Sequence, residues 1–210
     1  MTLPTDDPAS SAAGPDPHTS PAGSPARPAR YKAMTVLRSP DPIDSAQWQA
    51  TLAQHAEFLA SGGGGGSWTT LVTTADTDVG AVFGVYLGAK GTAGAQAKFS
   101  HARLEGVDLR GVDLSFADLC GVGCVNQDLT GANLRGCLAT DSDFTASRFN
   151  SATLAGADFS RSELVGCDFR NADLTGADLE KADLTNADLR GAKLDGARFP
   201  GAILDGARFD

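Results

Sequence analysis

The 210-residue chain has few of the side chains from which reactive or metal-binding sites are usually built: three His and four Cys. Lys and Arg number 17 against 26 Asp and Glu, which gives a formal net charge of −9. Binding to nucleic-acid phosphates needs clustered Lys and Arg, so this balance argues against direct nucleic-acid binding. No apolar run approaches the roughly 18 residues of a membrane-spanning helix, and we expect no membrane span.

Several targeting and binding motifs are also missing. The first residues lack the basic start and apolar core of a secretory signal. Residues 1–36 are rich in Pro, Ala and Ser, and we expect a disordered tail because they cannot bury enough apolar surface. The five-glycine run at 62–66 is not followed by Gly-Lys-Ser/Thr, which favours a flexible linker over a phosphate-binding loop. Arg outnumbers Lys 12 to 5, which is typical of a GC-rich bacterial genome, and we expect a cytoplasmic bacterial protein.

The sequence has instead a five-residue period, which runs in one frame from 97 to 210. In each five-residue step the third residue is Leu or Phe in 21 of 23 cases. The first residue is small, with Ala in 14 steps, and the second is most often Asp. The literal run Ala-Asp-Leu-x-x begins at Ala117, Ala172, Ala177, Ala182 and Ala187.

This period fits neither a helix nor a strand. Five residues of α-helix advance about 500°, so the Leu positions would drift and form no stripe. On a strand, an odd period would place successive Leu side chains on alternate faces. A coil that turns a corner every five residues meets the pattern, because each Leu or Phe then points inward. Stacked coils can bury an apolar side that a single coil cannot.

The motif resembles that of the pentapeptide-repeat family, Ala-Asp/Asn-Leu-x-x. The resemblance covers 97–210 and implies an all-β solenoid, a right-handed quadrilateral β-helix with four pentapeptides per coil. The repeat region then makes just under six coils. At an inter-strand spacing of ~4.8 Å this is a rod roughly 27 Å long.

Residues 43–96 are expected to form an N-terminal cap made of a helix, a Gly-rich linker and an irregular β segment. The helix is predicted over 44–61, with Asp44 as N-cap and Gln47 closing a capping box. Many members of the family have a short helix here, and Leu52, His55, Phe58 and Leu59 match its pattern. Residues 68–72 and 79–87 are β-prone and off the repeat frame, which favours either degenerate first coils or a small hairpin.

The repeat weakens between 122 and 141, where Cys124 and Ala139 stand at inward positions. One interpretation is a locally narrower core. The other is a bend or an exposed contact at Val125 and Leu138.

The cysteines favour neither a metal site nor a catalytic one. Cys120 and Cys124 are spaced like a metal pair, but in the repeat frame Cys120 points out and Cys124 points in. Cys137 and Cys167 occupy inward small-residue positions on other coils, so four-ligand convergence is not expected. A filled core with polar groups spaced outward leaves no cleft, and we predict no catalytic, cofactor or metal site, hence no enzyme.

The surface charge is uneven. Residues 20 apart share a side of the coils, and the repeat region carries 18 acidic and 12 basic residues. One side has Arg103 as its only base and nets −4. Acidic residues around scattered aliphatic side chains suit a partner with basic and apolar patches. We name this side the acidic side, and its candidate partner-binding residues are Glu105, Val125, Asp143, Glu163, Val165, Asp183, Ile203 and Asp205.

Two functions follow. The first is a non-enzymatic protein–protein interaction module that presents the acidic side to an unidentified protein. The alternative is implied by the resemblance: some family members protect DNA gyrase or topoisomerase IV by imitating duplex DNA, which gives resistance to quinolones or gyrase poisons. This chain departs from those proteins because no C-terminal dimerisation helix and no projecting loop is visible. Its repeat region also nets −6, against roughly 16 charges for ~27 Å of duplex DNA.

The two ends of the solenoid differ. The predicted helix should cover the first coil, since uncovered β edges invite pairing with another chain. Nothing comparable follows Phe209, and we predict an end-to-end homodimer through the C-terminal coil.

Overall fold

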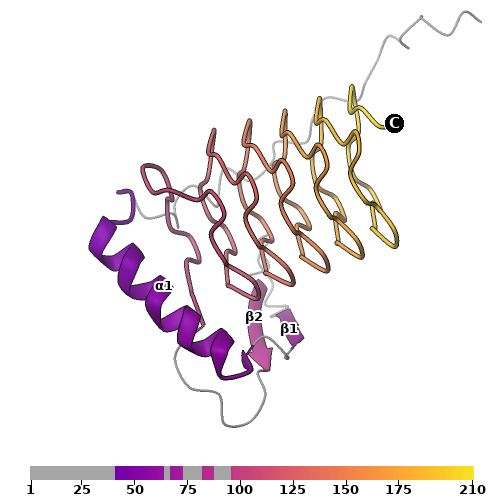
Figure 1. Cartoon of the computed structure of the whole chain (residues 1–210). Helices are drawn as coiled ribbons and strands as arrows, with labels where there is room; N and C mark the ends of the chain where they lie inside the picture. Colours follow the sequence, from indigo (N-terminus) through magenta and orange to yellow (C-terminus); the bar gives the residue numbers. More distant parts are fainter. Residues whose placement is uncertain (1–40, 64–66, 73–81, 88–95) are drawn as a thin grey trace, which may run out of the picture. The chain divides into compact units, whose positions relative to one another are not determined.

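The computed structural model describes residues 41–63, 67–72, 82–87 and 96–210. The chain divides into two units, Met1–Lys32 and Ala33–Asp210, and every described residue belongs to the second. Helix α1 (Ser45–Ala60) comes first, followed by strands β1 (Ser67–Val72) and β2 (Val82–Leu87) and then by the repeat region (Figure 1). The tail predicted to be disordered, 1–36, lies outside the described residues.

The repeat region is a stack of coils that repeat every 20 residues. From Lys98 onward, each β-bridge joins the second residue of one step, in parallel, to the residue 20 positions later, as in the series Asp143, Glu163, Asp183 and Ile203. A turn follows each of these residues, so the bridges remain isolated and do not extend into strands. A 20-residue period and a five-residue step together give four pentapeptides per coil, as predicted.

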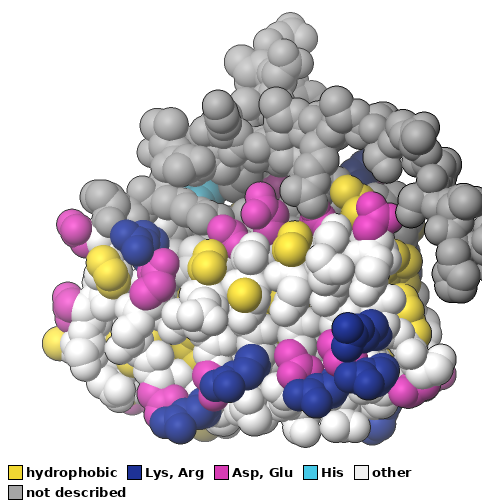
Figure 2. All heavy atoms as spheres, turned by 90° about the horizontal axis from the view of Figure 1, so that it is seen from above, with side chains coloured by type: hydrophobic (Ala, Val, Ile, Leu, Met, Phe, Trp, Pro, Cys, Tyr) yellow, Lys and Arg dark blue, Asp and Glu magenta, His cyan; other side chains and the backbone are white. Residues whose placement is uncertain are grey.

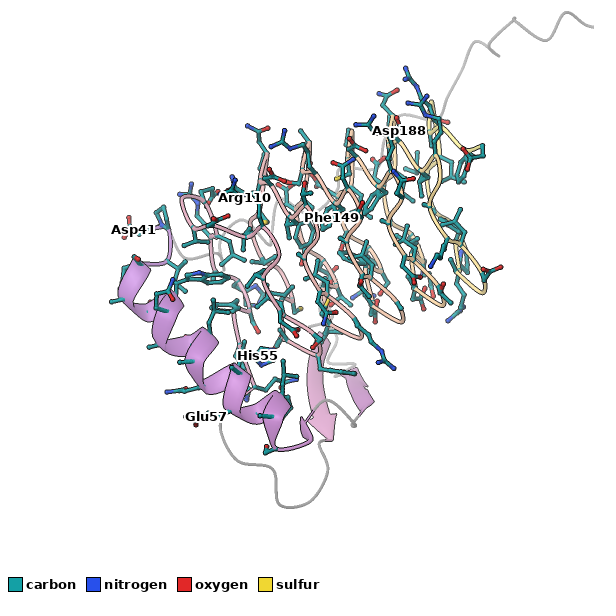
Figure 3. All side chains as sticks on the ribbon, viewed as in Figure 1. Asp41, His55, Glu57, Arg110, Phe149 and Asp188 are labelled. Carbon is teal, nitrogen blue, oxygen red and sulfur yellow. The ribbon has the colours of Figure 1, made fainter. Side chains whose placement is uncertain are left out.

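The third residue of every step from 99 to 189 points into the coils and is buried, with at most 3% of its surface exposed. Figure 3 shows one of them, Phe149, inside the stack. The sequence predicts this for four successive sides of one coil, and Leu174, Leu179, Leu184 and Leu189 are each at most 1% exposed. The predicted frame is therefore confirmed.

A cluster of four Phe side chains explains the weak stretch of the repeat. Phe149 stacks on Phe169 with ring centroids 4.9 Å apart and meets Phe144 and Phe159 edge to face. The 20-residue register puts Cys124 in the same column as Phe144, and Ala139 in the same column as Phe159. Small side chains at these two positions therefore leave room for the aromatic rings, because a core is filled to a nearly constant density.

The two exposed contacts predicted for this stretch have different outcomes. Leu138 is 1% exposed, so the exposed contact predicted there is wrong: the side chain is buried although the repeat frame places it outward. Val125 is 36% exposed and stays a candidate.

Aspartate recurs at the second position because it caps the turn that follows. Its Oδ1 accepts a hydrogen bond from the backbone N–H two residues later, as between Asp173 and Thr175 (3.0 Å) or Asp178 and Glu180 (3.0 Å). An Asx turn of this kind supplies a partner for an amide at the corner of the coil. Asn133 does the same for Arg135, so Asp and Asn are interchangeable at this position.

The first residue of a step has a small side chain because it packs against the preceding coil. Serine is tolerated there when its hydroxyl has a hydrogen-bond partner. Ser142 donates to the carbonyl of Leu119 (2.7 Å), and Ser162 donates to the carbonyl of Ala139 (2.6 Å). Each bond crosses to the preceding coil. A buried hydroxyl is thus satisfied, which removes most of its burial cost.

The last residue of a step turns the corner with a positive φ, and side chains there constrain the next coil. Phe116 has φ 60°, and its ring covers Gly136, which has φ 59°. A Cβ on Gly136 would lie 2.7 Å from Cε1 of Phe116. The positive φ favours glycine at Gly136, and the ring of the previous coil leaves no room there for a side chain.

Helix α1 spans Ser45–Ala60, within the predicted 44–61. Asp44 is its N-cap, and its carboxylate accepts from the N–H of Gln47 (2.8 Å), which confirms the predicted N-cap. The return bond from the Gln47 side chain, which would close a capping box, stays a prediction. The helix contacts the first coil through Trp48, which is 2% exposed and lies 5.0 Å from the ring of Phe99. Just before the helix, the N–H of Ile43 donates to the carbonyl of Arg103 (2.9 Å).

The segment between α1 and the repeats contains a hairpin-like pair. β1 and β2 form a two-stranded antiparallel sheet with Trp68 opposite Tyr86 and Thr69 opposite Val85. This is the hairpin alternative, and the degenerate-coil alternative is wrong for these residues because the strands pair with each other. Most of the predicted glycine linker, 64–66, and the remaining parts of the predicted β segment, 73–81 and 88–95, lie outside the described residues.

Candidate interaction surface

The predicted acidic side is brought together by the 20-residue register. Asp143, Glu163 and Asp183 are bridged in succession, so three acidic residues follow one another up one column. Strands in such a ladder are ~4.8 Å apart, which places the carboxylates close enough to add their fields. Glu105 and Asp205 lie at the two ends of this side, five coils apart.

The members of this side differ in exposure, and one prediction needs correction. Asp183 is 4% exposed and cannot be a contact residue on an open surface. Its carboxylate folds back over the turn and accepts from both the N–H (3.0 Å) and the hydroxyl of Thr185. Glu163 and Asp205 are exposed, and Asp143 is half-buried. Glu105 forms an ion pair with Arg103 (3.2 Å), so its charge is partly neutralised.

The aliphatic members lie beside the carboxylates. Val125 is exposed, whereas Val165 and Ile203 are half-buried. Val125 and Val165 occupy equivalent turn positions, two coils apart, with Thr145 between them. The surface predicted from sequence therefore reduces to Asp143, Glu163 and Asp205 with Val125 and Val165, and Glu105 and Ile203 at its margins.

On the adjoining side of the coils, several carboxylates form ion pairs with arginine side chains. Arg110 pairs with Asp108 (2.8 Å), Arg170 with Asp168 (2.7 Å) and Arg190 with Asp188 (2.6 Å). Figure 2 shows basic and acidic side chains next to one another along an edge of the coils. The hydrogen bonds from Arg190 are the main cause that lowers the pKa of Asp188 to about 2.

The sequence did not reveal how many carboxylates cap turns or pair with arginine. The Asx turns and the Arg pairs involve side chains that the repeat frame places toward water. The recurrence of Asp two residues before a turn residue was the available signal for the turns. The number of carboxylates on one side of the coils is therefore larger than the number available to bind a partner.

The cysteines behave as buried apolar residues. Cys120 is 7% exposed, which corrects the prediction that it points to water, and it contacts the hydroxyl of Thr140 (3.3 Å). Burial raises the pKa of Cys120 to about 11 and that of Cys167 to about 12. Such thiols stay protonated at neutral pH and are poor nucleophiles and ligands. Within residues 41–63 and 96–210, no His, Cys, Asp and Glu side chains are grouped as a metal site.

Among the helices of the described part, none is long and apolar enough to cross a membrane.

Several solved structures are similar to this chain over about half of its length. The chain is 33% identical to a pentapeptide repeat protein of the Arabidopsis thaliana thylakoid lumen, over 47% of this chain and 66% of that one, with a TM-score of 0.32. It is 23% identical to trypsin-treated QnrB1, a plasmid-mediated fluoroquinolone resistance protein, over 53% and 55%, with a TM-score of 0.41. HetL, involved in heterocyst differentiation regulation in the cyanobacterium Nostoc, is 26% identical over 54% and 66%, with a TM-score of 0.21.

The chain thus spans less than two thirds of the length of these proteins. No curated protein matches it. The family model for pentapeptide repeats matches eight copies, at residues 95–122, 128–164, 152–191 and 182–210, which together cover just over half of the chain. With this match and the 20-residue register of its coils, the chain belongs to the pentapeptide repeat family.

Proposed function

We propose that this chain is a non-enzymatic protein-binding module that presents its acidic side to a protein partner in the bacterial cytoplasm. The observation that carries the proposal is that the register gathers Asp143, Glu163 and Asp205 on one side of the coils, with Glu163 and Asp205 exposed. The carboxylates of this side add to one negative field, which attracts a basic partner surface. We also infer for these coils the right-handed winding of the family.

The chemistry of the surface defines the partner. Glu163 and Asp205 are exposed and Asp143 is half-buried, while Val125 and Val165 supply aliphatic contacts between them. A partner surface with Lys or Arg around an apolar centre is complementary in both charge and polarity. A few central residues usually dominate such an interface, so we expect Val165 and Glu163 to contribute most.

The experiment compares two triple variants. The first carries Asp143→Asn, Glu163→Gln and Asp205→Asn. The second, a matched control, carries Asp108→Asn, Asp168→Asn and Asp188→Asn on the adjoining side. Both sets change the net charge equally, and Asn retains the Oδ1 that caps a turn. Immobilised wild-type protein and both variants are used to capture proteins from a bacterial lysate, with quantitative mass spectrometry.

We expect at least one protein to be captured by the wild type and by the control, and lost with the acidic-side variant. Equal capture by all three forms, or loss with the control alone, would refute the assignment of the surface. Thermal unfolding of each form checks that neither set of substitutions has disrupted the structure.

Mimicry of DNA toward gyrase or topoisomerase IV is the competing function, and supercoiling assays separate it from the proposal. A mimic would inhibit or rescue gyrase at micromolar concentration, and its effect would fall steeply with salt. We expect no effect, because the acidic side contains a buried Asp183 and an ion-paired Glu105.

A further inference from the structure

Besides the apolar packing of Leu52 on the core, hydrogen bonds join the region of helix α1 to the backbone of the first coil at two separate places. Near its start, the N–H of Ile43 donates to the carbonyl of Arg103 (2.9 Å), and Trp48 lies against Phe99. In its second half, His55 accepts a hydrogen bond at Nδ1 from the backbone N–H of Ala97 (3.0 Å). The second attachment joins residues 42 positions apart through one imidazole nitrogen. His55 lies on the side of α1 that faces the coils (Figure 3).

The protonation state of His55 is fixed by this hydrogen bond. An imidazole nitrogen that accepts from an N–H carries no proton, so neutral His55 has its proton on Nε2. Nε2 is also buried, and the backbone of Ser115 lies beside the ring. A second proton would have to go to Nδ1, where it would face the N–H of Ala97. Two donors would then point at each other, and the attachment would be lost.

The surroundings of His55 oppose its charged form. The side chain is 1% exposed, and its ring stacks on Phe58 with centroids 5.7 Å apart. Burial lowers the pKa of His55 below its ordinary value of 6.5, and Asp113 and the backbone of Ser115, both on the first coil, raise it by less. Glu57 on the same helix is exposed.

We propose that protonation of His55 releases the second half of α1 from the first coil, so that acidification opens this cap and uncovers the coil edge at Ala97. The first half stays attached through Ile43 and Trp48, whose contacts involve no titrating group. Only the second half of α1 therefore detaches, while the coils and the first half of the helix keep their structure. The opened state presents Ala97 and the apolar residues next to it, which are buried when the cap is closed.

The direction of the pH effect follows from linkage. The unfolded or opened chain binds a proton to His55 more readily than the closed cap does, because the closed cap lowers the pKa. The closed state is therefore fully stable above pH 6.5 and loses stability as pH falls through the lower pKa of the closed form. One proton changes the closed-to-open ratio by at most about tenfold per pH unit.

The test is amide hydrogen exchange of the full chain between pH 7.5 and 5, expressed as protection factors so that the intrinsic pH dependence of exchange is removed. We expect protection of Ala97 and of the second half of α1 to fall by up to about tenfold per pH unit, while the coils keep theirs. In His55→Asn, the side-chain oxygen accepts without titrating, so protection should not change with pH. His101→Asn, which alters a histidine of the first coil and leaves His55 in place, should behave as wild type.

Protection that is independent of pH in the wild type, or the same fall in His55→Asn, would overturn the proposal. If His55→Asn does not fold, the imidazole resonances of the wild type decide the question. A His55 pKa at or above 6.5 contradicts the proposal, whereas a lower value accompanied by the loss of protection supports it.

Discussion

Replacing Gly136 with Ala tests how one coil restricts the next. The new Cβ would lie 2.7 and 2.8 Å from Cε1 and Cδ1 of Phe116, closer than any real Cβ contact, so the ring has to move. The ring also carries a contact with the guanidinium of Arg135, whose Cζ lies 6.0 Å from its centroid. Gly131→Ala is the matched control, because it has a similar positive φ but no atom within 4 Å of the added Cβ.

Both substitutions introduce a side chain at positive φ, which costs about 1–2 kcal/mol. Overpacking against Phe116 adds roughly 1–3 kcal/mol for Gly136→Ala alone. At about 2–4 °C per kcal/mol for a chain of this size, its Tm should lie roughly 2–12 °C below that of Gly131→Ala. The measurement is thermal unfolding followed by circular dichroism.

A double-mutant cycle with Phe116→Ala isolates the steric part. Without the ring, Gly136→Ala should cost no more than Gly131→Ala, and the coupling energy should be close to the overpacking estimate. The reasoning is refuted if Gly136→Ala and Gly131→Ala lower Tm equally, or if Phe116→Ala leaves the cost of Gly136→Ala unchanged.

Three further predictions concern the core, the charged side and the C-terminal coil. Leu179→Asp buries a charge without a partner and should destabilise by several kcal/mol, whereas Thr175→Asp on an exposed turn should change Tm little; equal Tm values would contradict the frame. The carboxyl of Asp188, whose pKa is lowered to about 2, keeps its stabilising contribution above its ordinary 3.8 and loses it as pH falls through 2. Carbon-13 NMR of the Asp188 carboxyl should show the lowered pKa, and Arg190→Gln should raise that pKa. The end-to-end homodimer remains a prediction: Phe209 is 43% exposed, and Phe209→Glu should shift sedimentation toward monomer, whereas an all-monomeric wild type would contradict it.

The frame, the core and the period of the coils were predictable because one residue type recurs at one position. Leu174 to Leu189 are buried as the five-residue period requires, and the N-cap at Asp44 follows from local sequence. These features depend on nearest neighbours in the chain or on an unbroken repeat. Each repeat shows independently which positions point inward, so an error in assigning one step does not shift the assignment of the next.

The features that could not be predicted depend on residues in different coils. Asp183 and Leu138 are buried although the repeat frame points them outward. The frame gives the direction of a side chain but not the neighbours that cover it. Likewise, the role of Cys124 and Ala139 becomes clear only with Phe144 and Phe159 stacked in the same columns. Reading the sequence in steps of 20, with residue volumes compared down each column, would have found this.

Site-specific photo-crosslinking tests the central claim, that the acidic side binds a protein partner. A photoreactive phenylalanine analogue replaces Thr145, which lies between Val125 and Val165, or Thr175, which occupies the equivalent turn position on the opposite side of the coils. The account predicts that the partner captured by wild type crosslinks at position 145 and not at 175, and that the crosslink weakens with rising salt. A crosslink at 175 without one at 145 would contradict it.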